Sequence, residues 1–121
     1  MSIMMNTGQV LYNLGPLDRL PRGEGRTFLI ENTPVAIFRT RQDEVFATQA
    51  SCPHKGGPLA DGIIGAGKVI CPLHAYKFDL ANGKAAENSC MALKTYTVSV
   101  SETGDLLLNF TEHGALSKSA R

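Results

Sequence analysis

Two short stretches of this chain, CPHKGGPLADG (residues 52–62) and CPLHAYKFD (residues 71–79), share an unusual opening. Each begins with cysteine and proline and places a histidine two or three residues after the cysteine. The whole chain has only three cysteines and three histidines, so two of each type fall in these two segments. The four residues are Cys52, His54, Cys71 and His74.

Three interpretations of this pattern compete. Free cysteine is a common core residue, so the four residues are ordinary core and surface side chains if the matched spacing arises by chance. Two cysteines and two histidines also form a suitable tetrahedral set for a structural zinc ion. Zinc motifs, however, usually group cysteine with cysteine and histidine with histidine, whereas each stretch here offers one of each type.

The third interpretation is a [2Fe–2S] cluster with mixed ligands, in which two thiolates bind one iron and two imidazoles bind the other. Each stretch would then give its cysteine to one iron and its histidine to the other. Glycines beside the ligands would let the backbone approach the cluster, and the prolines would stiffen both loops.

The gross composition sets limits on the other classes of function. A length of 121 residues predicts one domain, spanning 1–121 with a core at about 8–110. A net charge of +1 gives no basic surface of the kind that nucleic acid requires. No apolar run reaches the ~18 residues of a membrane span, and the N-terminus lacks the pattern of a secretory signal, so we expect a cytoplasmic protein without a membrane partner.

Short runs rich in β-branched residues alternate with turn signals and predict an antiparallel all-β domain. In the run 95–101, Tyr96, Val98 and Val100 alternate with hydroxyl residues, which predicts one buried and one solvated face. The region 51–86 contains six glycines and predicts a subdomain built of loops, inserted into the β scaffold. The expected strands are 9–13, 27–30, 35–40, 45–48, 95–101 and 105–110, with a turn at 31–34.

The spacing Cys52-x-His54, sixteen residues, Cys71-x-x-His74 resembles the Rieske cluster motif. Together with VAIFRT (residues 35–40), the two stretches are similar to the small subunit of assimilatory NAD(P)H nitrite reductase and to the Rieske ferredoxins of ring-hydroxylating dioxygenases. The resemblance implies an all-β, Rieske-type antiparallel β sandwich or barrel with an inserted cluster-binding subdomain at about 51–86. It also implies one Rieske [2Fe–2S] cluster per chain, held by the four residues.

The chain departs from the Rieske proteins of respiratory complexes at several positions. Those proteins join the two loops by a disulfide, but Gly57 and Leu73 stand at the corresponding places here. They also carry hydroxyl groups near the cluster, at positions that align with Tyr76 and Phe78, and Phe78 has no hydroxyl. The third loop, residues 87–93, lacks the usual proline and contains Cys90, for which we expect no ligand role.

Electron transfer, rather than catalysis, is the function that these residues predict. A Rieske oxygenase needs a further iron on two histidines and a carboxylate, and only His113 remains once His54 and His74 are used. The resemblance implies a large flavin- and siroheme-containing nitrite reductase subunit as partner. Two alternatives stay open: a ferredoxin that shuttles electrons from a flavin reductase to an oxygenase, and a structural zinc module.

Overall fold

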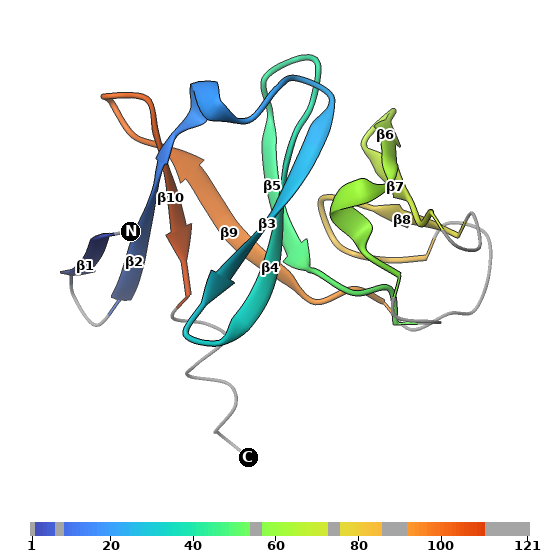
Figure 1. Cartoon of the computed structure of the whole chain (residues 1–121), viewed down its shortest axis with the longest axis horizontal. Coiled ribbons are helices and arrows are strands. Elements are labelled where there is room, and N and C mark those ends of the chain that lie inside the picture. The colour runs from blue at the N-terminus through green and yellow to red at the C-terminus, as the bar shows by residue number, and fades with distance from the viewer. Residues whose placement is uncertain (1, 7–8, 54–56, 73–75, 86–91, 111–121) are drawn as a thin grey trace. The chain divides into compact units, whose positions relative to one another are not determined.

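The computed structural model, drawn in Figure 1, describes most of the chain. The predicted ligands His54 and His74 lie outside the described residues, as do Cys90 and His113. Within the described part, no helix has the length and apolar character that crossing a membrane requires. The described residues are 2–6, 9–53, 57–72, 76–85 and 92–110.

Strands dominate the described residues, which confirms the predicted all-β fold. Two short 3-10 helices accompany them, η1 (Leu17–Arg19) and η2 (Leu59–Asp61). The strands are β1 (Ser2–Asn6), β2 (Gln9–Pro16), β3 (Glu24–Ile30), β4 (Thr33–Arg39), β5 (Val45–Gln49), β6 (Ile63–Gly65), β7 (Lys68–Ile70), β8 (Lys77–Asp79), β9 (Thr95–Val100) and β10 (Asp105–Asn109).

The chain divides into two compact units, of which one comprises Met1–Arg19 and Tyr96–Arg121. Its strands follow the order β1-β2-β10-β9, and all neighbours are antiparallel. The predicted alternation in β9 is only partly observed, because Tyr96 is buried and Val98 half-buried but Val100 is 40% exposed. The Phe110 ring lies between two tyrosines, stacked on Tyr96 at 5.7 Å and edge-on to Tyr12 at 5.9 Å between centroids.

The other unit, Leu20–Thr95, contains an antiparallel sheet in which β4 lies between β3 and β5. The apolar residues of β4 from Val35 to Phe38 are fully buried, so both faces of this strand are covered. Ile30 pairs with Thr33, and the two residues between them have positive φ angles, which is the type I′ hairpin turn. The predicted turn at 31–34 was therefore too long, since Thr33 and Pro34 belong to β4.

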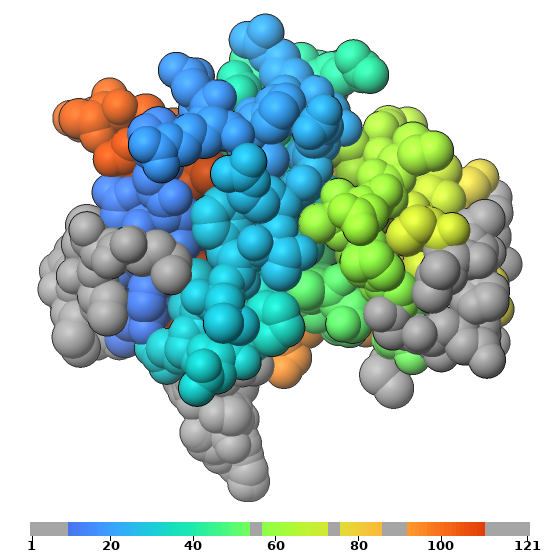
Figure 2. Space-filling view, in the orientation of Figure 1, coloured from blue at the N-terminus to red at the C-terminus, as the bar shows by residue number. Residues whose placement is uncertain are grey.

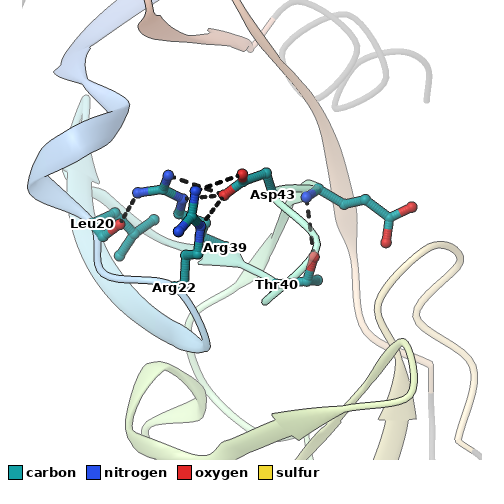
Figure 3. Close-up of polar contacts among 6 residues, drawn as sticks. Leu20, Arg22, Arg39, Thr40 and Asp43 are labelled. Carbon is teal, nitrogen blue, oxygen red and sulfur yellow. Dashed lines mark hydrogen bonds and ion pairs between the residues drawn. The ribbon is translucent and has the colours of Figure 1, made fainter.

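The β4–β5 connection carries a network of charged side chains, shown in Figure 3. Asp43 adopts φ 68° and ends a three-residue loop in which the Thr40 N–H donates to the Glu44 carbonyl at 2.8 Å. Its carboxylate accepts two hydrogen bonds from Arg22, at 2.8 and 3.0 Å, and one from Arg39 Nε at 3.0 Å. The network thus links the hairpin to the segment that precedes β3.

The inserted region 51–86 has more regular structure than the sequence predicts. Strands β6, β7 and β8 form an antiparallel sheet of their own, with β7 in the middle. Helix η2 contacts β3, and in Figure 2 the surface of this region, in green to yellow, adjoins the light-blue and cyan strands of the same unit. Short strands thus accompany the predicted loops in this region, and strands of three residues leave too short a pattern to recognise in the sequence.

Candidate metal centre

Cys52 lies at the last rung of a short hairpin stem. The Leu59 N–H donates to the Ala50 carbonyl at 2.9 Å, and Ser51 forms a β-bridge with Pro58. The Cys52 N–H then donates to the carbonyl of Gly57 at 2.8 Å. Backbone hydrogen bonds therefore close this stem from Ala50 and Leu59 up to Cys52 and Gly57.

Cys71 occupies the equivalent rung of a second stem. Strands β7 and β8 pair up to Ile70 and Lys77, and the Cys71 N–H donates to the carbonyl of Tyr76 at 2.8 Å. In both loops the cysteine N–H thus bonds to the carbonyl five residues further on. The two segments with similar Cys/His order therefore hold their cysteines with the same backbone hydrogen bond.

Both cysteine side chains are buried in one hydrophobic cluster. Cys52 is 2% exposed and Cys71 is 1% exposed, and neither is part of a disulfide. One buried thiol among apolar neighbours is unremarkable, but two at matching rungs of two stems form a pair of soft ligands suited to iron. The other buried members of the cluster are Ala36, Phe38, Leu59, Val69, Phe78, Leu80 and Leu93.

Two glycines allow the backbone segments around this cluster to approach one another. A Cβ at Gly62, just after η2, would collide with the carbonyl oxygen of Ile70, the residue before Cys71. A Cβ at Gly83 would collide with the carbonyl of Leu93, whose N–H donates to Gly83 at 2.7 Å. Glycine is therefore required at these two positions by a close approach of two backbone segments. The predicted approach of glycine backbone to the cluster is a different contact and stays a prediction.

The two aromatic positions singled out in the sequence lie on or beside the second stem. Phe78 is fully buried and pairs with Val69 across β7 and β8, whereas Tyr76 is half-buried and packs against the same hydrophobic cluster. Across the described residues, no group of three or more histidine, cysteine, aspartate or glutamate side chains gathers in a way that could hold a metal. The two cysteine stems are consequently the best candidate for a metal centre in that part of the chain.

An antiparallel β domain with two cysteine-bearing hairpins, each also carrying a histidine in its sequence, defines a class of small iron–sulfur domains. The model of the Rieske-like [2Fe-2S] domain family matches residues 11–108 of this chain. The chain therefore belongs to the Rieske-like [2Fe-2S] domain family, and its cofactor is a Rieske [2Fe–2S] cluster. The buried thiol pair fits that cofactor, because two thiolates bind one of its irons.

Known relatives include a dioxygenase ferredoxin and a nitrite reductase small subunit. The ferredoxin component of the naphthalene 1,2-dioxygenase/salicylate 5-hydroxylase systems of Ralstonia sp. is 31% identical over 88 residues, which cover 69% of this chain and 81% of that one. A structure assigned as the small subunit of an NADPH nitrite reductase has a TM-score of 0.74 and 31% identity, covering 81% of this chain and 96% of that one.

A third relative extends the comparison of the fold. The structure assigned as the small subunit of an NADH-dependent nitrite reductase from Mycobacterium tuberculosis has a TM-score of 0.78. It shares 24% identity and covers 84% of this chain and 95% of that one. The chain thus has a Rieske β fold and is a Rieske-type electron carrier, related to both nitrite reductase small subunits and dioxygenase ferredoxins.

Sequence reasoning found the cysteines but missed the stems that hold them. The carbonyls of Gly57 and Tyr76, which fix the two cysteine N–H groups, carry no side-chain signal. An available hint was the apolar pair Val69-Ile70 before Cys71, because a buried pair next to a turn is typical of a short strand.

Proposed function

We propose that this chain is the small subunit of an NAD(P)H-dependent nitrite reductase in nitrate assimilation. It would pass single electrons within a complex whose large subunit holds flavin and siroheme. The observation that carries this proposal is the 31% identity to a structure assigned as such a small subunit, over 96% of that chain. The large subunit would contain the catalytic site, and this chain would supply the cluster.

The proposed ligands are Cys52 and Cys71 for one iron and His54 and His74 for the other. A Rieske cluster supplies a one-electron couple whose potential depends on hydrogen bonds to its sulfurs and on exposure to solvent. The chain's own contribution is to keep the thiol side in an apolar core, where Cys52 and Cys71 are almost inaccessible. The backbone bonds to Gly57 and Tyr76 fix the bases of both ligand loops.

Substitution of single cysteines tests the ligand set. Cys52→Ser and Cys71→Ser should each abolish the red-brown colour and the rhombic electron paramagnetic resonance (EPR) signal of the reduced protein. Wild type should contain about two irons and two labile sulfides per chain, as this cluster type requires. Cys90→Ser is the matched control and should retain the cluster. Retention of a full cluster in Cys52→Ser or Cys71→Ser would contradict the assignment.

Purification from the native host tests the proposed partner. A resident subunit should remain with a large flavin- and siroheme-containing chain as the salt concentration is raised, because a stable interface buries more area than a transient one. A shuttle should bind through less than about 1,200 Å² and dissociate as salt screens its charges. The companion chain retained at high salt would be identified by mass spectrometry and by its siroheme absorption.

A ferredoxin of a ring-hydroxylating oxygenase is the second candidate. Its support is the 31% identity to the ferredoxin component from Ralstonia sp. over 81% of that chain. Recovery of this protein alone, with rapid reduction by a separate flavin reductase and electron transfer to an oxygenase, would favour the ferredoxin over the nitrite reductase subunit.

A further inference from the structure

The two cysteine stems differ in strength. The Cys71 stem belongs to a three-stranded sheet in which β7 pairs with both β6 and β8. The Cys52 stem has an isolated bridge between Ser51 and Pro58, and Pro58 has no N–H with which to extend a ladder. The Cys52 stem therefore depends on contacts from outside itself to hold its cysteine.

Gln49, the last residue of β5, provides such contacts. Its side-chain Nε2 donates to the Ser51 carbonyl at 2.7 Å, and its Oε1 accepts the Lys94 N–H at 2.7 Å. Its backbone N–H also donates to the Lys94 carbonyl at 2.8 Å. One half-buried glutamine thus joins the entry of the first loop to the residue that precedes β9.

The bond to Ser51 acts directly on the cysteine. The Ser51 carbonyl belongs to the same peptide unit as the Cys52 N–H, and that N–H is bound to the Gly57 carbonyl. A peptide unit is planar, so fixing its C=O and its N–H also fixes the orientation of its plane. The Cys52 Cα is itself an atom of this plane, so the direction of the Cys52 N–Cα bond is set by Gln49 and Gly57 together.

We propose that Gln49 is a positioning residue for Cys52, which it orients through the Ser51–Cys52 peptide. The inference rests on the proposed role of Cys52 as a cluster ligand and is independent of which partner receives the electron. Gln49 is not one of the proposed ligands and would act through the Ser51 carbonyl. Its side chain matters because it has the length and the two opposite polar groups needed to bond Ser51 and Lys94 at once.

The test is Gln49→Met in the iron-loaded protein, since methionine keeps the unbranched length of glutamine and removes both polar groups. Iron release to a chelator should accelerate by about tenfold, the effect expected from losing one or two net hydrogen bonds. Deuterium uptake should rise in the peptide covering 50–60 and stay unchanged in the peptide covering 68–80. The EPR spectrum of the remaining reduced cluster should shift, which a general loss of stability would not cause.

Two further variants complete the design. Gln42→Met, the same change at the exposed opposite end of the β4–β5 hairpin, should leave iron release within about twofold of wild type, because surface substitutions have small effects. Gln49→Asn keeps the amide but is one methylene shorter, so it should behave like Gln49→Met. If Gln49→Met fails to fold, Gln49→Asn gives the same readouts with a side chain that keeps its polar amide.

Several outcomes would overturn the proposal. Wild-type iron release, exchange and EPR spectrum in Gln49→Met would do so, and so would normal behaviour of Gln49→Asn. An equal rise in exchange at 50–60 and 68–80 would show that Gln49 only stabilises the whole unit. An iron-free wild type would instead defeat the ligand assignment, and the exchange pattern of Gln49→Met would still report on the link between Ser51 and Lys94.

Discussion

At the scale of single residues, Asp43 shows how one carboxylate can serve two cations. Arg39 is 10% exposed at its side chain, and its Nη1 donates to the Leu20 carbonyl at 2.8 Å. The hydrogen bonds from Arg22, followed by those from Arg39, lower the pKa of Asp43 from 3.8 to about 2. The carboxylate thereby neutralises a largely buried guanidinium.

This lowered pKa predicts a pH-dependent contribution to stability. Because the pKa of Asp43 is lower in the folded protein than in the unfolded chain, the contribution is complete above about pH 4 and is lost as the pH falls through about 2. The difference in unfolding free energy between wild type and Asp43→Asn should therefore be largest near neutral pH and shrink between about pH 4 and 2. Asparagine also tolerates the positive φ of this position.

Urea unfolding at a series of pH values measures that difference. The acid sensitivity of the cluster is common to both proteins and cancels in the comparison. Arg22→Gln is the complementary variant: it removes the largest cause of the lowered pKa, so its own difference from wild type should also decline towards acid pH. Parallel pH profiles for wild type and Asp43→Asn would show that this ion pair does not contribute to folding.

At the scale of elements, strands with clear patterns were predictable and those fixed by distant partners were not. The run from Val35 to Phe38 is apolar throughout, which is typical of a strand covered on both faces, and β4 matches it. Pro34 was assigned to a turn because proline is a frequent turn residue, but it lies in β4 opposite Leu29. The turn itself needs only the two residues with positive φ.

The candidate site likewise has features that the sequence predicts and features that it does not. The cysteines were visible from their spacing, because ligand chemistry requires particular side chains. The stems that hold them are made of backbone hydrogen bonds, such as Cys52 to Gly57 and Cys71 to Tyr76, which any donor residue except proline can form. Gln49 escaped notice for a related reason: its partner Lys94 is remote in sequence, and both bonds to it involve the Lys94 backbone.

At the scale of the whole molecule, the two compact units have different relations to the cofactor. Both proposed thiolate ligands, Cys52 and Cys71, belong to the unit Leu20–Thr95 and lie in its hydrophobic cluster. The other unit contains none of the cysteines of that cluster; its buried residues include Leu106, Leu108 and three stacked or edge-on aromatic rings. Metal binding should therefore stabilise one unit far more than the other.

Removal of iron by a chelator tests this difference. An iron held by Cys52 and Cys71 closes the loop between them as a cross-link does, and closing a loop of this size by a disulfide contributes about 3 kcal/mol. After iron removal, deuterium uptake should rise strongly at 50–60 and 68–80, while β2 and β10 should keep most of their protection.

Cys90→Ser, loaded and then stripped in the same way, is the control and should give the same pattern. A uniform rise across both units would mean that the cluster stabilises the whole chain as one cooperative body, and an absence of any rise would mean that Cys52 and Cys71 do not share an iron.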